Sequence, residues 1–226
     1  MTQIYCFSAT GRTRQIADYF ADKLSSQVYE LPCESAVCGT AIVVFPVYCQ
    51  ALPAPVKAFL PKLTAARLVL IASYGHMSYG NVLWEASRLN KAPVIAAACV
   101  PIGHSYLNEE TGFDCSLLDP ILERIRFPRE ITVPKTHKDF FAGLMPGLRS
   151  RLGVRMKKTE ACTDCRLCIT KCPVGAMTEK GPGKHCIRCL RCACVCPAGA
   201  MEYSLTAPVR LYLRKKRCSQ FLILLS

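Results

Sequence analysis

The chain has 226 residues, of which 51% are hydrophobic, and its formal net charge is +13. This length accommodates one ordinary domain and a smaller one, and no apolar run approaches the ~20 residues that span a bilayer, which excludes an integral membrane protein. Residues 1–145 hold 13 Lys and Arg against 12 Asp and Glu, whereas residues 146–226 hold 16 against 4. The positive charge is therefore concentrated in the C-terminal third.

The amino terminus predicts a strand, a hydroxyl-rich loop and a helix. Residues 3–7 are a short apolar run, and apolar residues recur at helical spacing over residues 16–24. The loop between them carries Ser8, Thr10 and Thr13 at the start of the helix, where backbone N–H groups and the helix dipole favour a phosphate. The first residues lack the basic start and apolar stretch of a signal peptide, so we expect a cytoplasmic protein.

Strands and helices alternate through the next part of the chain. Strands are predicted at residues 27–31, 40–45, 67–73 and 93–100, and helices at residues 55–63, 81–90 and 117–126. Such alternation is typical of a doubly wound α/β fold with a parallel five-stranded sheet. The connection over residues 32–39 is short for a parallel crossover, which usually needs a dozen or more residues.

Residues 127–158 are punctuated by Pro and Gly around Asp139, Phe140 and Phe141, and residues 148–156 have the pattern of a short amphipathic helix. We expect this segment to link two domains, residues 1–126 and residues 159–226. The second domain ends in a basic tail at residues 214–217 and a short apolar run at residues 221–225.

Two copies of one cysteine pattern, CxxCxxCxxxCP, dominate the second domain. The ligand candidates are Cys162, Cys165, Cys168 and Cys172 in the first copy, and Cys186, Cys189, Cys192 and Cys196 in the second. Both copies end in Gly-Ala-Met, which indicates two homologous halves. This spacing is the signature of thiolates that bind 4Fe-4S clusters.

In this pattern the first three cysteines hold three corners of one cluster, and the fourth, displaced by the proline turn, reaches the cluster of the other half. We therefore assign Cys162, Cys165, Cys168 and Cys196 to a first cluster, and Cys186, Cys189, Cys192 and Cys172 to a second. Two structural zinc sites are an alternative, but they leave the third cysteine and the CP ending of each copy unexplained. A disulfide framework is disfavoured because nothing indicates secretion.

Eight further cysteines lie outside these positions: Cys6, Cys33, Cys38, Cys49, Cys99, Cys115, Cys194 and Cys218. In a reducing compartment most of them are expected to be small buried hydrophobic residues. So many free thiols favour an anaerobic habitat.

The N-terminal domain resembles flavodoxins, because Ser8-x-x-Gly11-x-Thr13 followed by Ala17 is similar to their phosphate-loop signature. The chain departs from that signature at Cys6 and Phe20. The resemblance implies an FMN site at the carboxyl ends of the strands, where an exposed tyrosine stacks on the flavin. The implied contacts are Ser8, Ala9, Thr10, Gly11, Arg12, Thr13, Pro46, Val47, Tyr48, Ser73, Tyr74 and Gly75, with Tyr79 and Gly80 as secondary candidates.

The second domain resembles the α+β ferredoxins with two clusters, and the whole chain resembles the flavodoxin and ferredoxin fusion proteins of anaerobes. The resemblance implies a soluble electron-transfer protein that passes electrons between FMN and two 4Fe-4S clusters. Two other hypotheses stay open. One is a flavin-dependent reductase of a small acceptor such as a quinone or a free flavin. The other is a docking or sensor protein in which the flavodoxin-like domain holds no flavin.

The chain offers no set of nucleophile, base and orienting acid, so hydrolytic catalysis has no support, and whether the chain is an enzyme stays open. Nucleic-acid binding is disfavoured because no reading motif accompanies the basic residues. We expect the basic surface to bind an acidic redox protein, with peripheral contact to a membrane surface as a second use.

Overall fold

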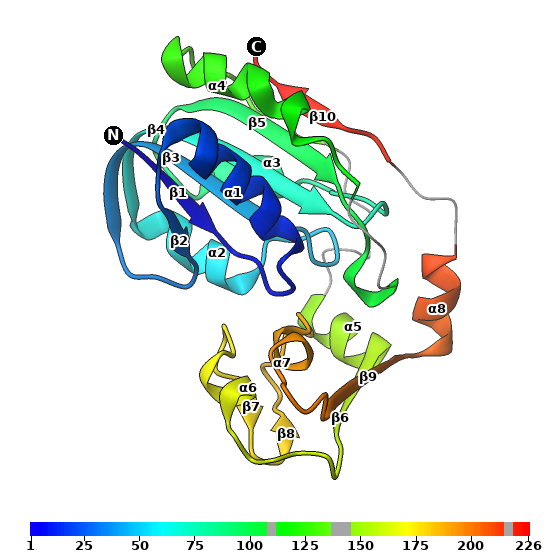
Figure 1. Ribbon diagram of the computed structural model, residues 1–226. Helices are drawn as coiled ribbons and strands as arrows, with labels where there is room; N and C mark the ends of the chain where they lie inside the picture. The colour runs from blue at the N-terminus through cyan, green and yellow to red at the C-terminus, as the bar shows by residue number, and fades with distance from the viewer. Residues whose placement is uncertain (108–111, 137–145, 215–218) are drawn as a thin grey trace. The chain divides into compact units, whose positions relative to one another are not determined.

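The computed structural model describes residues 1–107, 112–136, 146–214 and 219–226, without the side chains of residues 146–149. The chain forms two compact units, Met1–Gly143 with Cys218–Ser226, and Leu144–Arg217 (Figure 1). The last residues therefore belong to the first unit. We expected them to end the second domain, so that part of the predicted division differs from the structure.

The first unit is built on a six-stranded sheet in the order β10-β5-β4-β3-β1-β2. Its strands are β1 (Thr2–Cys6), β2 (Val28–Glu30), β3 (Ala36–Pro46), β4 (Leu63–Tyr74), β5 (Val94–Pro101) and β10 (Leu222–Leu224). The five strands predicted from the sequence are all present and pair in parallel. Their order, 2-1-3-4-5, is that of flavodoxin-like sheets, which confirms the predicted fold class.

The sixth strand, β10, was not predicted. It pairs antiparallel with β5, placing Leu222 opposite Cys99 and Leu224 opposite Ala97. The ring of Phe221 also lies against Phe113, with centroids 5.3 Å apart. The apolar run at residues 221–225 therefore covers the edge of β5, which would otherwise present unpaired N–H and C=O groups.

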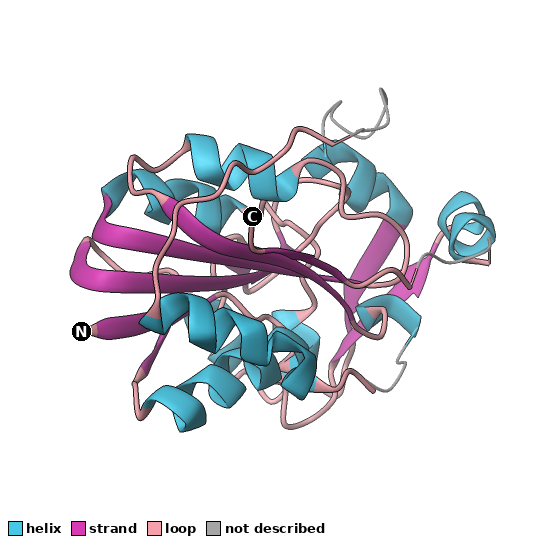
Figure 2. Ribbon diagram, turned by 90° about the horizontal axis from the view of Figure 1, so that it is seen from above, coloured by secondary structure: helices cyan, strands magenta, loops and turns pink. Residues whose placement is uncertain are grey.

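Helices cover both faces of the sheet (Figure 2). The regular helices of the unit are α1 (Arg12–Leu24), α2 (Ala54–Phe59), α3 (Val82–Arg88) and α4 (Asp119–Arg126), with 3-10 turns at Leu60–Lys62, Ser105–Leu107 and Cys115–Leu118. Phe20 of α1 and Ile121 of α4 share one apolar core with β1, β3, β4 and β5. On the other face, Phe59 of α2 lies against the ring of Tyr5, with centroids 4.8 Å apart.

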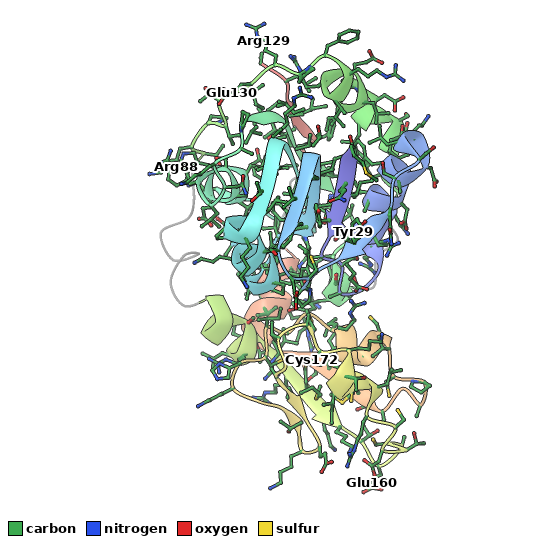
Figure 3. All side chains as sticks on the ribbon, turned by 90° about the vertical axis from the view of Figure 1, so that its left-hand side faces the viewer. Tyr29, Arg88, Arg129, Glu130, Glu160 and Cys172 are labelled. Atoms are coloured by element: carbon green, nitrogen blue, oxygen red, sulfur yellow. The ribbon has the colours of Figure 1, made fainter. Side chains whose placement is uncertain are left out.

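The connection between β2 and β3 is as short as the sequence indicates. Leu31–Ser35, between β2 and β3, contains no helix, and β2 forms the outer edge of the sheet beside β1. Tyr29 of β2, labelled in Figure 3, stacks on Tyr5 of β1 with ring centroids 5.6 Å apart. The edge strand is thus held by its side chains as well as by its ladder with β1.

The second unit contains two short ladders and four short helices. Its strands are β6 (Val154–Lys158) paired with β9 (Met201–Leu205), and β7 (Met177–Thr178) paired with β8 (Gly181–Pro182). Its helices are α5 (Pro146–Gly153), α6 (Leu167–Thr170), α7 (Arg191–Cys194) and α8 (Ala207–Leu213). The predicted helix over residues 148–156 is wrong beyond Gly153, because residues 154–158 pair with β9. Asp139, Phe140 and Phe141 of the predicted linker lie outside the described residues.

Each half of the cysteine repeat has the same local structure. A short helix follows the second cysteine, and it begins after a residue in the left-handed region, Arg166 (φ 57°) in one half and Leu190 (φ 65°) in the other. Met177, Cys192 and Met201 form a small buried cluster between the halves. Among the described helices, none is both long enough and apolar enough to cross a membrane.

Candidate functional site

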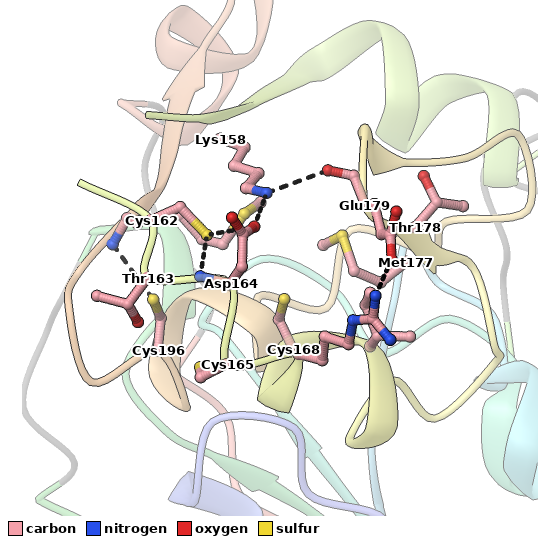
Figure 4. A pocket seen from close by; sticks show the side chains of 14 residues that line it. Lys158, Cys162, Thr163, Asp164, Cys165, Cys168, Met177, Thr178, Glu179 and Cys196 are labelled. Atoms are coloured by element: carbon pink, nitrogen blue, oxygen red, sulfur yellow. Dashed lines mark hydrogen bonds and ion pairs between the residues drawn. The ribbon is translucent and has the colours of Figure 1, made fainter. Parts of the chain in front are cut away.

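The first set of thiols lines one cavity. Cys162, Cys165, Cys168 and Cys196 surround a space of about 280 Å³ (Figure 4). Burial raises the pKa of the Cys168 thiol, and Cys162, Cys196 and Cys165 raise it further. The fourth cysteine of the second motif therefore lies beside the first three cysteines of the first motif.

The second set is gathered in the same crossed manner and is more deeply buried. Burial raises the pKa of Cys189 to about 11, and the nearby thiols of Cys186 and Cys172 add to this increase. Burial likewise raises the pKa of Cys192 to about 12, with Cys189, Cys186 and Cys172 contributing. Such thiols lose their protons when a metal takes up the negative charge, as cluster binding requires.

The Gly-Ala-Met ending of each motif has a local function in the structure. Gly175 and Gly199 have φ values of 59° and 60°, a conformation that glycine adopts without strain. This turn directs the N–H of Ala176 to Cys172 Sγ at 3.2 Å, and the N–H of Ala200 to Cys196 Sγ at 3.3 Å. Both bonds hold the sulfur of the fourth cysteine in the same orientation in each motif.

The thiols of the first set line one space and do not converge on one point. Cys162, Cys165, Cys168 and Cys196 share the lining of this space with ten other residues. Within the described ranges, no group of three or more His, Cys, Asp or Glu side chains is placed to hold one metal ion.

A charged network lies beside the first set of thiols. Lys158 Nζ donates to Asp164 Oδ1 at 2.7 Å and to the carbonyl of Glu179 at 3.2 Å. Asp164 lies 3.6 Å from Cys162 Sγ through Oδ1, and its N–H donates to the same sulfur at 3.4 Å. Figure 4 shows Lys158, Asp164 and Cys162 together. We did not predict these two charged residues, although an Asp between two candidate ligands was a signal in the sequence.

The loop predicted to bind a phosphate connects β1 and α1. Gly11 begins the helix with a φ of 86°, and no side chain caps α1. In the first turn, the N–H of Arg14 donates to Ser8 Oγ at 3.1 Å and to the carbonyl of Gly11 at 3.1 Å. Ser8 and Ala9 are buried and Thr10 is half-buried. These features suit an anion at the start of α1.

Side chains tie the phosphate loop to the carboxyl ends of β4 and β5. Thr13 Oγ1 and Ser73 Oγ share a buried hydrogen bond of 2.8 Å. Arg12 donates to the carbonyl of Gly103 at 3.0 Å, and Thr10 Oγ1 lies 3.4 Å from Ser105 Oγ. The predicted residues Thr10, Arg12, Thr13 and Ser73 therefore meet at one edge of the sheet.

The predicted tyrosines differ in exposure. Tyr48 is half-buried, with its ring edge-on to Phe7 at 6.2 Å. Tyr74 is only 2% exposed, and its hydroxyl donates to the carbonyl of Gln220 beside β10. Tyr79 is half-buried and meets Tyr74 edge-on at 5.3 Å. The expectation that Tyr74 offers an exposed face is wrong, because β10 brings Gln220 to its hydroxyl.

The remaining predicted residues shape the loops around this edge. Pro46 and Val47 are half-buried, and the N–H of Val47 donates to the carbonyl of Ser73 at 2.8 Å. A Cβ on Gly75 would lie 2.7 Å from the ring of His104, and one on Gly80 would lie 2.8 Å from Cβ of Gln50. Both glycines therefore allow a close approach between loops, and Gly80 also has a φ of 58°.

The cysteines outside the two motifs are less buried than expected. Only Cys6 and Cys99 are buried; Cys33, Cys49 and Cys194 are exposed, and Cys38 and Cys115 are intermediate. Cys218 lies outside the described residues. The expectation that most of these thiols are buried is wrong, because several occupy loops and strand ends instead of the apolar core.

Comparison with known proteins supports the iron-sulfur site directly. Residues 157–178 match the 4Fe-4S binding domain. This match covers the first motif, and the second motif lies outside it. No curated protein is similar enough to count as a match.

One solved structure shows a weak similarity to this chain. A crystal structure described as that of "a putative flavoprotein" from Bacteroides eggerthii DSM 20697 is 15% identical, with a TM-score of 0.37. The similarity covers 55% of this chain and 97% of that chain. The fold assignment rests on the strand order and not on this similarity.

Proposed function

We propose that the chain is an iron-sulfur flavoprotein that passes electrons between FMN and two 4Fe-4S clusters and on to a protein partner. The observation that carries this proposal is the crossed gathering of the thiols, in which each set joins three cysteines of one motif with the fourth of the other. A flavin exchanges one or two electrons and each cluster one, so together they connect two-electron and one-electron chemistry.

The residues of the flavodoxin-like unit supply the flavin part of the proposal. Backbone N–H groups at the start of α1 and the hydroxyl of Thr10 would hold the phosphate of FMN. Tyr48 would lie against the ring system, while Thr13 and Ser73 hold the loops in place. Ser105 and Gly103, which follow β5, extend this set.

The first test is the content of iron, acid-labile sulfide and FMN in protein purified without oxygen. About eight irons, eight sulfides and one FMN per chain are expected. Eight irons without FMN, even after FMN is supplied, would refute the flavin part and favour a protein whose flavodoxin-like unit serves docking. Fewer than eight irons after anaerobic reconstitution would refute the two-cluster part.

Single Cys→Ser variants test the crossed assignment. Cys162→Ser and Cys196→Ser are expected to lose the same cluster and to leave identical electron paramagnetic resonance (EPR) spectra. Cys194→Ser is the matched control, because Cys194 is exposed and lies two residues before Cys196. If Cys196→Ser instead leaves the spectrum that Cys186→Ser leaves, the fourth cysteine binds within its own motif and the crossed assignment is wrong.

A small-acceptor reductase makes a different prediction. Such an enzyme would turn over a free quinone or flavin without a protein partner. The basic surface favours a partner instead, since the second unit holds most of the excess positive charge. Reduction of an acidic partner is then expected to slow as salt concentration rises, whereas turnover of a neutral quinone is not.

A further inference from the structure

The two cysteine halves differ in charge at matched positions. Asp164 lies between the first two cysteines of the first motif, and Arg188 holds the same place in the second motif. Both have left-handed backbones, with φ values of 51° and 55°. Lys158, four residues before Cys162, corresponds to Pro182 in the second half. The first half therefore contains a lysine and carboxylate pair that the second half lacks.

Both the backbone and the side chain of Lys158 are held in place. It is the last residue of β6, which pairs with Met201 of β9. Its side chain is 28% exposed, and its Nζ is held by Asp164 Oδ1 at 2.7 Å and by the carbonyl of Glu179 at 3.2 Å. The nearby Cys162 thiol, after Asp164, also raises the pKa of Lys158. The ammonium thus lies at the rim of the first cavity, whose lining includes Lys158.

Cluster binding changes the balance of this network. As a thiol, Cys162 is within 3.6 Å of the Asp164 carboxylate and can donate to it. As a cluster ligand it has lost that proton, so a carboxylate and a negatively charged sulfur lie side by side. The Asp164 N–H still donates to the sulfur at 3.4 Å, and the ammonium of Lys158 remains to offset both negative charges.

We propose that Lys158, held in place by Asp164, is a positioning residue that favours the reduced state of the first cluster and thereby separates its reduction potential from that of the second. The proposal rests on the cluster part of the proposed function. In the step concerned, the cluster gains one electron from a donor, no protein bond forms or breaks, and Lys158 keeps its proton. A fixed positive charge near the added electron stabilises the product of that step.

The test is a redox titration of the full chain with both clusters, followed by EPR under anaerobic conditions. Cys186→Ser identifies the signal of the first cluster. Lys158→Gln removes the ammonium, and Lys157→Gln is the matched control. It removes the same charge from the preceding residue of β6, whose side chain points to the opposite side of the strand and is exposed. Lys158→Arg keeps the charge, and Asp164→Asn removes the carboxylate and leaves the ammonium.

Lys158→Gln is expected to lower the equilibrium constant for one-electron reduction of the first cluster about tenfold. This change corresponds to a decrease of ~59 mV in the reduction potential of that cluster. Asp164→Asn should raise the reduction potential of the first cluster. Lys158→Arg should keep most of the wild-type potential of that cluster, and the potential of the second cluster should not change in any of these variants. Equal shifts at both clusters, or shifts no larger than those of Lys157→Gln, would overturn the inference while leaving the proposed function intact. If Lys158→Gln loses the cluster, the same titration of Lys158→Met decides the matter, because this variant keeps the aliphatic stem and removes the charge, and an unchanged potential would overturn the inference.

Discussion

Deletion of residues 219–226 tests whether the last strand is an integral part of the sheet. The deletion removes β10 from the edge of β5, together with Phe221, Ile223 and Leu225, which are half-buried against the main core. Full burial of a side chain of this size contributes roughly 1.5–3 kcal/mol, so half-burial of three contributes about 3 kcal/mol. Lost ladder hydrogen bonds bring the expected decrease in unfolding free energy to about 4 kcal/mol.

The chain provides separate probes for its two units. Trp84 of α3 is the only tryptophan, so its fluorescence reports unfolding of the sheet unit. Visible absorbance of the proposed clusters reports the other unit. With a typical urea m-value of about 2 kcal/mol per molar, the Trp84 transition should move down by ~2 M, whereas the cluster absorbance of the folded protein should persist.

The matched control for this experiment is Leu211→Ala. Leu211 is 67% exposed on α8, so this truncation should change the unfolding free energy by no more than about 0.5 kcal/mol. Ile223→Ala is the milder variant within β10, with an expected loss of about 1–2 kcal/mol. A Trp84 transition that the deletion leaves in place would refute the reasoning, because the strand would then contribute nothing to the sheet.

Three further predictions concern the sheet unit and use the same fluorescence assay. Gly80→Ala places a Cβ 2.8 Å from Gln50 in a left-handed backbone, so it should lower the unfolding free energy by about 1–3 kcal/mol, whereas no effect would mean that the two loops separate freely. Thr13→Val leaves the buried Ser73 hydroxyl without its Thr13 partner and should lower the unfolding free energy by about 1–3 kcal/mol. It should also weaken FMN binding, measured by quenching of flavin fluorescence, and Thr13→Ser should restore both properties. Burial, and then a neighbouring carboxylate, raise the pKa of Tyr19 to about 12. The contribution of Tyr19 to the unfolding free energy is therefore complete below pH 10 and is lost as the pH rises toward 12. Tyr19→Phe should reduce this alkaline loss of stability, and an unchanged dependence of the unfolding free energy on pH would assign the loss to other groups.

The sequence predicts those features that depend on local pattern. Apolar strands that alternate with amphipathic helices predict a parallel sheet, because the helices of the β-α-β connections cover both faces of that sheet. The cluster ligands are equally local, since three cysteines at fixed spacing wrap one metal centre wherever the motif lies. Even the crossing of the fourth cysteine follows from the proline turn, and the structure brings Cys196 beside Cys168.

Features that depend on contacts distant in sequence were not predictable in this way. The run at residues 221–225 is too short to indicate a strand until β5 offers an edge for it. Tyr74 looks like an exposed loop residue until Gln220, distant in sequence, accepts its hydrogen bond. Lys158 carries no signal at all without the β6–β9 ladder, which holds the end of β6 in place.

Hydrogen bonds attach the chain to the sheet unit both before and after the second unit. The chain approaches the second unit through Thr136, whose hydroxyl donates to the carbonyl of Gly80 at 2.7 Å. It returns at Ser219, whose hydroxyl lies 2.9 Å from Nδ1 of His76, and at Gln220, which accepts from Tyr74. These three bonds are made to Tyr74, His76 and Gly80, at and after the end of β4, and the second unit is an insertion in the sequence between the two attachments.

An insertion of this kind has to be stabilised by contacts among its own residues. The β6–β9 ladder and the small core of Met177, Cys192 and Met201 lie entirely within residues 146–214. Releasing one anchor by deletion of residues 219–226 should therefore leave the iron content unchanged while the sheet unit loses stability. If iron is lost as well, the return strand supports both units, and the cluster unit is not an independent insertion.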